Sequence, residues 1–184
     1  MKLIILGPPG SGKGTQARLL KRDLKLKHIS SDILRNEIKK KTKLGKIFEK
    51  YINRGDLVPD HLINPLIKKH IPKDNFIIDG YPRRVGEAKY LDNYCRPDHV
   101  IFLDVPKNAL IKRLLKRAKI EGRKDDTLDI IKERFRVYEK ETKPVIKHYK
   151  NKMIKITGNK KPEIVEKELL KILNNENRNS KTKP

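Results

Sequence analysis

The stretch Gly7-Pro8-Pro9-Gly10-Ser11-Gly12-Lys13-Gly14-Thr15 lies between an apolar run, Lys2–Leu6, and a segment with helical spacing. It nearly fits the phosphate-loop pattern G-x-x-x-x-G-K-[ST], with Gly14 placed between Lys13 and the hydroxyl residue Thr15. Glycines let backbone N–H groups curl around phosphate oxygens, and a helix N-terminus adds a favourable dipole. Lys13 offers a positive charge to the β and γ phosphates, and the Thr15 hydroxyl can face Mg²⁺. Because a strand leads in and a helix leads out, we predict a nucleotide-binding loop rather than a plain glycine-rich turn.

Short apolar runs that alternate with segments of helical spacing predict an α/β fold, and the phosphate-loop motif after the first run makes this fold similar to the P-loop NTPase type. Several runs are apolar on consecutive residues, which suits strands buried on both faces. We therefore expect a five-stranded parallel sheet flanked by helices. The predicted strands are Lys2–Leu6, Lys27–Ser30, Asn75–Asp79, His99–Asp104 and Met153–Ile156. The predicted helices are Gly12–Leu24, Asp32–Lys41, Pro59–Ile71, Arg84–Tyr94, Lys107–Lys119, Thr127–Lys152 and Pro162–Leu173.

The chain is expected to form one domain over residues 1–173. Residues 31–71 carry helix signals but no strand, so they are expected to form a helical insert between two strands. A short loop is expected at about residues 118–126, and the stretch 174–184, which has no apolar residue, is expected to be disordered. The core is then made of residues 1–30, 72–117 and 127–173.

The charge balance points to an anionic partner. Lys and Arg number 46 against 23 Asp and Glu, a formal net charge of +23. This excess favours phosphate groups, nucleotides, nucleic acid or an acidic membrane surface. Cys95 is the one cysteine, which excludes an intrachain disulfide and favours a reducing, cytoplasmic location. No apolar run is long enough for a membrane span, and the run after Met1 is too short for a signal peptide, so no membrane segment is expected.

Further motifs follow the phosphate loop in a fixed order along the chain. They are Ile29–Arg35 (ISSDILR, against I-S-T-G-D-x-L-R), Asp79–Arg83 (DGYPR, against D-G-[FY]-P-R), Arg113–Arg117, Gly122–Asp126 and Arg134. Together with the form Gly-x-Pro-Gly-Ser-Gly-Lys-Gly-Thr, they make the sequence similar to the nucleoside monophosphate kinases, and in particular to the adenylate kinase family. The resemblance covers residues 1–173, nearly the whole chain.

This resemblance implies a short-form adenylate kinase, which transfers the γ-phosphoryl group of ATP reversibly to AMP and gives two ADP. Catalysis would be mostly positioning and charge stabilisation by guanidinium groups, which bind phosphate bidentately. The resemblance implies Mg²⁺ bound with ATP, with Thr15 and, through water, Asp79 as metal-site residues. Only residues 118–121 separate Arg117 from Gly122, so a short mobile lid is expected instead of a lid domain with a zinc site, and no structural zinc.

The resemblance also assigns the site residues, with residues 31–71 as the monophosphate-binding insert. Arg113 would stack on the donor base, and Leu57 and Val58 would pack on the acceptor base. The implied catalytic residues are Lys13, Arg83, Arg117, Arg123 and Arg134. The implied ATP-binding residues are Pro9, Gly10, Ser11, Gly12, Lys13, Gly14, Thr15, Arg113, Arg117 and Gly158. The implied AMP-binding residues are Ser30, Ser31, Arg35, Leu57, Val58, Gly80, Arg83, Glu87, Arg123 and Arg134.

Two departures leave the acceptor base open. The segment Ser30-Ser31-Asp32 lacks the glycine that usually precedes the aspartate. Glu87 stands where adenylate kinases usually have glutamine, and an ionised carboxylate accepts hydrogen bonds but cannot donate one. It could hold the amino group of adenine or of cytosine, so CMP competes with AMP as the acceptor.

Two alternative functions stay open beside adenylate kinase. One is a UMP/CMP kinase or a broad-specificity nucleoside monophosphate kinase. The other is an RNA-binding P-loop protein, which the positive charge favours, and non-specific nucleic-acid contact is also compatible with a kinase. Asp125 and Asp126 fit helix capping or the positioning of Arg134 as well as ligand contact. The chain is expected to be a monomer or a small homo-oligomer.

Overall fold

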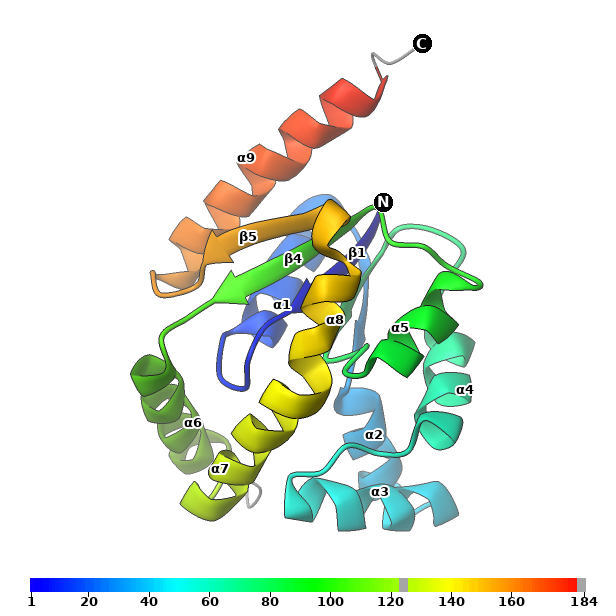
Figure 1. The fold of residues 1–184 in the computed structure, drawn as a ribbon, viewed down its shortest axis with the longest axis vertical. Coiled ribbons are helices and arrows are strands. Elements are labelled where there is room, and N and C mark those ends of the chain that lie inside the picture. The colour runs from blue at the N-terminus through cyan, green and yellow to red at the C-terminus, as the bar shows by residue number, and fades with distance from the viewer. Residues whose placement is uncertain (123–125, 182–184) are drawn as a thin grey trace.

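A computed structural model describes residues 1–122 and 126–181 of the chain. Its centre is a five-stranded sheet in the order β2-β3-β1-β4-β5, in which all neighbouring strands are parallel. This confirms the predicted α/β fold of the P-loop NTPase type (Figure 1). The strands are β1 (Lys2–Leu6), β2 (Lys27–Ser30), β3 (Phe76–Asp79), β4 (His99–Asp104) and β5 (Met153–Thr157).

The two faces of the sheet are covered by separate hydrophobic clusters. Successive side chains of a strand point to opposite faces. In β1, Ile4 and Leu6 therefore join one cluster, whereas Leu3 and Ile5 join the other. Consecutive apolar residues thus mark a strand buried on both sides, as the sequence predicts.

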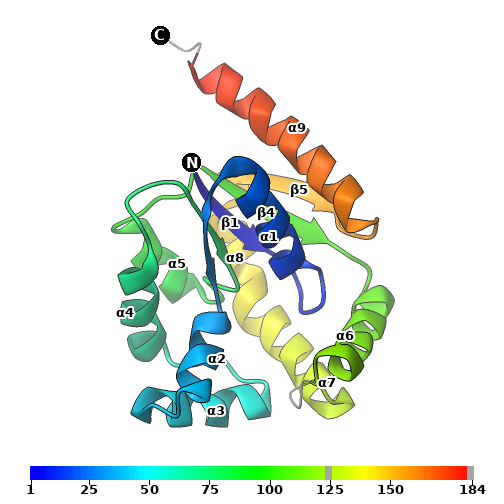
Figure 2. The same ribbon diagram turned by 180° about the vertical axis from the view of Figure 1, so that it is seen from behind.

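Different helices cover each face. On the side of Leu3 and Ile5, the cluster includes residues of α1 (Lys13–Leu24) and α9 (Pro162–Lys181), which contact each other. Figure 2 shows α1 in front of the sheet, with α9 running past its upper end. The opposite face carries α4 (Asp60–His70), α5 (Val85–Asp92) and α8 (Lys143–His148).

The interval between β2 and β3 is helical, as expected. It contains α2 (Asp32–Lys39), α3 (Lys43–Arg54) and α4. The hydroxyl of Thr42 caps α3 by accepting a hydrogen bond from the Gly45 N–H at 2.9 Å. Gly45 lies against α2 so closely that a Cβ there would overlap the carbonyl group of Glu37. Both devices fix the angle between α2 and α3.

The interval between β4 and β5 contains the two predicted helical segments, and the second one includes a π-helical turn. It contains α6 (Lys107–Glu121), α7 (Leu128–Val137), the π-helix η1 (Tyr138–Thr142), α8 and the 3-10 turn η2 (Lys150–Lys152). The predicted helix over residues 127–152 is confirmed as one uninterrupted helical segment over residues 128–148, which contains a π-helical turn and ends four residues earlier than predicted. Pro144 has no N–H for the usual ladder, and the Lys143 N–H reaches back five residues to the Tyr138 carbonyl.

Two helix ends lie beyond their predicted positions. Helix α6 continues to Glu121, so the connection to α7 is shorter than residues 118–126, and residues 123–125 lie outside the described part. Helix α9 continues to Lys181, so disorder is wrong for residues 174–181, while residues 182–184 lie outside the described part. No proline or glycine occurs between Glu163 and Lys181, so nothing local ends the helix. Within the described residues, no helix is long and apolar enough to cross a membrane.

We predict that Gly45→Ala destabilises the protein, because the new methyl group must displace the backbone of α2. The expected loss is about 1–3 kcal/mol of unfolding free energy. Thermal denaturation measures it. The matched control is Lys46→Ala, an exposed position on the same helix, which should change stability by less than about 0.5 kcal/mol. Equal melting temperatures for the two variants would contradict the close packing of α2 and α3.

Candidate active site

The loop between β1 and α1 has the geometry of a phosphate cradle. Gly10 and Gly12 have φ angles of 82° and 93°, a left-handed region that favours glycine. A Cβ on Gly10 would also lie 2.9 Å from the Leu110 carbonyl oxygen, so α6 packs directly on the loop. Because α1 begins at Lys13, its unpaired N–H groups face the same space.

The side chain of Lys13 folds back over this loop. Its Nζ donates to the carbonyl oxygens of Gly7 and Pro8, at 2.8 and 2.9 Å. Burial lowers the pKa of Lys13 to about 7; the Asp79 carboxylate opposes this shift, and the arginines of the cleft add to it. A bound polyphosphate would supply the missing counter-charge and hold the ammonium in its charged form.

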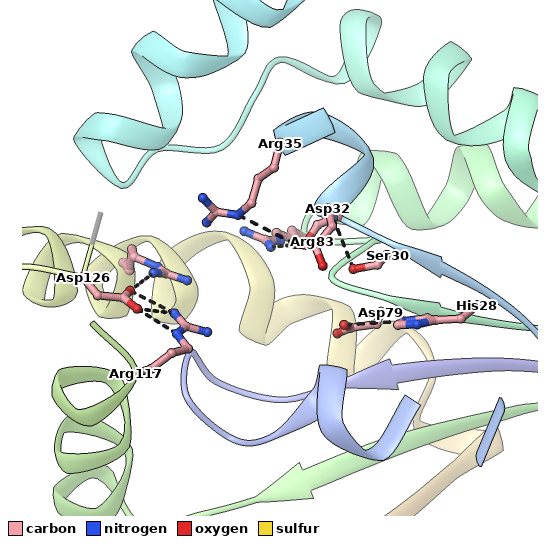
Figure 3. A network of polar contacts seen from close by, with 10 residues as sticks. His28, Ser30, Asp32, Arg35, Asp79, Arg83, Arg117 and Asp126 are labelled. Atoms are coloured by element: carbon pink, nitrogen blue, oxygen red, sulfur yellow. Dashed lines mark hydrogen bonds and ion pairs between the residues drawn. The ribbon is translucent and has the colours of Figure 1, made fainter. Parts of the chain in front are cut away.

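Asp79 ends β3 beside the loop, as predicted. Its Oδ2 is 3.8 Å from Nε2 of His28 (Figure 3). The same oxygen lies so close to Gly14 that a Cβ added to this glycine would be 3.1 Å away from it. The Thr15 hydroxyl and the Asp79 carboxylate line the same cleft. Two oxygen ligands beside a phosphate-binding loop suit Mg²⁺, which prefers oxygen. Among residues 1–122 and 126–181, no group of three or more His, Cys, Asp or Glu side chains could hold a metal ion.

The predicted donor residues gather around this loop. Arg113 donates from Nη1 to the Gly158 carbonyl oxygen at 3.0 Å, which joins α6 to the loop after β5. The predicted donor residues that line a cleft of about 400 Å³ are Pro9, Gly10, Gly12, Lys13, Gly14, Thr15, Arg113 and Arg117. Ser11 and Gly158 line an adjoining cavity of about 230 Å³. Gly12, Thr15 and Arg113 line both this cavity and the larger cleft.

The predicted acceptor residues form a second pocket between the insert and the core. Ser31, Arg35, Gly80, Arg83 and Arg134 line both this pocket and the larger cleft, so the two spaces are continuous. The predicted residues in the pocket are Ser31, Arg35, Leu57, Val58, Gly80, Arg83, Glu87 and Arg134. Ser30 lines the larger cleft instead, and Arg123 lies outside the described residues.

Arg83 is held in place from two sides of the pocket. Its Nε donates to the Gly80 carbonyl oxygen at 2.8 Å, and its Nη2 lies 3.5 Å from Oγ of Ser31. Its backbone N–H donates to Oε2 of Glu87 at 2.6 Å. Burial raises the pKa of the Glu87 carboxyl to about 7, and the Arg83 N–H partly opposes that shift.

Asp126 joins two arginines at the rim of the cleft. Its carboxylate accepts from Arg117 Nε and Nη2, at 2.7 and 2.9 Å, and also from Nη1 of Arg134 (Figure 3). Its side chain is fully buried. Thr127, not Asp126, caps α7. Of the roles left open by the sequence, positioning of Arg134 is therefore the one the structure supports. Figure 3 shows Arg35 and Arg83 pointing toward the same space from the opposite side.

Comparison with known proteins agrees with this arrangement. A family model described as adenylate kinase matches residues 5–154. The chain belongs to the adenylate kinase family. Similar relatives include the adenylate kinases of Petrotoga mobilis (36% identical over 97% of this chain and 100% of the relative), Prochlorococcus marinus subsp. pastoris (45% over 81% and 83%) and Azobacteroides pseudotrichonymphae (43% over 93% and 96%).

As a member of the adenylate kinase family, the chain is a phosphotransferase of the kinase type that binds nucleotides. The relatives support adenylate kinase function. Nothing in the comparisons favours the two alternatives, a UMP/CMP kinase or an RNA-binding protein.

Arg84 is a site residue that the sequence did not reveal. Its Nη1 donates to the Val58 carbonyl oxygen and to Oδ1 of Asp60, each at 2.9 Å. Its Nη2 lies 3.4 Å from the Leu57 carbonyl oxygen, and its Nε lies 3.5 Å from Oε2 of Glu141 in η1. Arg84 directly follows the Asp79–Arg83 motif, but its partners lie far away in the sequence. No local pattern could identify them.

Two further basic residues of the cleft were also missed. Lys116 fell on the solvated side of the helical spacing, yet it lines the cleft. Arg18, on α1, lines the same cleft, and its Nη2 lies 3.4 Å from Oγ1 of Thr15. Lys116 follows Arg113 by three residues, and Arg18 follows Gly14 by four. The signal that could have found them is this spacing from a predicted site residue, rather than the position relative to the apolar stripe.

We predict that Asp126→Ala lowers stability, because Arg117 and Arg134 lose the carboxylate between them. The expected loss is about 1–3 kcal/mol. Pyrophosphate should reduce this loss, since its oxygens can pair with the same guanidinium groups. Melting temperatures with and without pyrophosphate measure both effects. Asp129→Ala is the control, because that side chain is 95% exposed. If both variants melt at the same temperature, Asp126 does not hold the arginines together.

Proposed function

We propose that the protein transfers the γ-phosphoryl group of Mg²⁺-ATP reversibly to AMP and produces two ADP. The observation that carries this proposal is the continuous cleft between the phosphate loop and a second pocket. Arg35, Arg83 and Arg134 line both spaces. Two phosphate-bearing ligands could therefore meet there, surrounded by positive charge.

The chain's own residues would act by position and charge. The loop and Lys13 would hold the donor phosphates, and Arg35 and Arg83 would hold the acceptor phosphate. Arg117 would contact the donor, while Arg134 and Arg123 would bridge the two ligands. An ionised phosphate oxygen needs little help from a general base, so orientation and charge stabilisation account for most of the catalysis.

The cleft suits Mg²⁺ as well as phosphate. Thr15 and, through water, Asp79 would hold the ion, and both supply oxygen to the cleft. When bound, the ion would neutralise charge on the phosphates. Asp79 is 8% exposed and Lys13 is partly buried, so the chain supplies a carboxylate and an ammonium to the same cleft.

The acceptor base would lie in the second pocket. Leu57 and Val58 give this pocket apolar lining, and Glu87 gives it a carboxyl group. Arg84 would act as a positioning residue, because it binds the carbonyl oxygens of Leu57 and Val58. The helical segment 31–71 would therefore be the monophosphate-binding insert. We also propose a cytoplasmic location, because Cys95, the one cysteine, is buried and free.

We predict that Lys13→Ala lowers kcat for ADP formation from ATP and AMP. Loss of a charge aimed at the transferring group should reduce kcat by about 100- to 1000-fold. A coupled ADP-release assay measures it. Lys21→Ala, on the exposed face of α1, should keep full activity. If Lys13→Ala retains its kcat, or if the unchanged protein transfers phosphate to no monophosphate, the proposed function is wrong.

We predict that Arg84→Gln raises the KM for AMP while the KM for ATP stays constant. Loss of the charged contacts to the base loop should cost ~1 kcal/mol, about a fivefold rise. Initial rates at saturating concentrations of the other substrate separate the two constants. Arg96→Gln, at an exposed position, is the control. A rise in both constants would indicate a general loss of structure rather than a positioning role.

A further inference from the structure

Glu87 is a nearly buried residue that lines the acceptor pocket. It belongs to the first turn of α5, is 3% exposed, and lines the pocket together with Leu57 and Val58. Its Oε2 accepts the Arg83 backbone N–H at 2.6 Å. A carboxyl oxygen has two lone pairs, so Oε2 can accept a second hydrogen bond, and Oε1 stays available as well.

Charged and titratable groups surround this carboxyl on several elements. Asp60 of α4 disfavours its ionised form, whereas Arg83 and Arg84 favour it. The Tyr81 hydroxyl donates to the Glu87 backbone carbonyl at 3.2 Å, not to its carboxyl. The other such groups that line the pocket are Arg35 of α2, Asp56 of the loop before α4, and Arg134 of α7.

Burial is the largest influence on this carboxyl. It raises the pKa of Glu87 to about 7 in spite of the neighbouring arginines. Below that pH the group is predominantly a neutral carboxylic acid, which has one O–H donor and a carbonyl acceptor. A neutral carboxylic acid thus offers the same donor and acceptor as the glutamine amide usual at this position.

We propose that Glu87 binds the acceptor base as a neutral acid, with Oε1–H donating to a ring nitrogen and Oε2 accepting from the adjacent amino group. This proposal rests on the proposed function of the same pocket and names its base class. Adenine and cytosine both carry an unprotonated ring nitrogen beside an amino group. Guanine and uracil carry an N–H at that ring position, which would meet the O–H donor.

Ionisation of Glu87 removes the donor. A carboxylate can still accept from the amino group, but its second oxygen then faces the lone pair of the ring nitrogen. AMP should therefore bind more weakly as the pH rises through 7. Binding above that pH should also take up a proton, because the ligand favours the neutral form.

The experiment measures AMP binding by calorimetry at pH 6 and pH 8 for the unchanged protein and for Glu87→Gln. The phosphate of AMP titrates near pH 6, but it does so equally for both proteins, so the ratio of their dissociation constants is the readout. The dissociation constant of the unchanged protein divided by that of Glu87→Gln should rise about tenfold from pH 6 to pH 8. Glu163→Gln, at an exposed position on α9, should behave like the unchanged protein.

A second measurement counts protons directly. At pH 8, binding enthalpies in buffers of different ionisation enthalpy should show about one more proton taken up per AMP by the unchanged protein than by Glu87→Gln, because both proteins share the contribution of Lys13. Parallel pH curves for the two proteins, or equal proton uptake by them, would falsify the proposal. If AMP is still phosphorylated in that case, the proposed function survives and only the role of Glu87 is wrong. If AMP is neither bound nor phosphorylated at any pH, both fail.

Discussion

The buried carboxylate of Asp126 is the contact on which the shape of the cleft depends. It lets Arg117 of α6 and Arg134 of α7 face one space, although two cations brought together in a partly buried site repel each other. The contact also fixes the end of α6 relative to the start of α7. The arginines are therefore positioned before any phosphate arrives, and less ordering remains to be done on binding.

Elsewhere in the cleft, positively charged groups lie close together without enough negative charge to balance them. Burial lowers the pKa of both Lys13 and Arg83, and the Asp79 carboxylate opposes the shift in both. Such groups reduce the stability of the fold, and phosphate restores the missing counter-charge. A site that binds several phosphates is therefore a place where we expect the sequence to give up some stability for function.

Local patterns predict the frame of this fold but not every residue of the site. The consecutive apolar residues of β1 and the glycines of the phosphate loop are local signals, and the structure confirms both. Arg84 depends on carbonyl groups 26 and 27 residues earlier, which only the folded insert brings near. The helix over residues 128–148 is continuous, but its π-helical turn just before Pro144 is not visible in the periodicity, which predicts a regular α-helix. For Asp126 the sequence leaves capping, positioning of Arg134 and ligand contact open, and the fold adds Arg117 as a partner.

The insert is tied to the core mainly through α4. The Tyr81 hydroxyl donates to Asn64 Oδ1 at 2.8 Å, and Arg84 binds Asp60 at 2.9 Å. These polar contacts join α4 to the loop between β3 and α5, while α2 and α3 pack chiefly on each other. The apolar lining that would hold the acceptor base therefore belongs to the fixed part of the insert. In the proposed function, Leu57 and Val58 would hold the acceptor base on the anchored part of the insert, whereas Arg35, which would hold the acceptor phosphate, lies on α2.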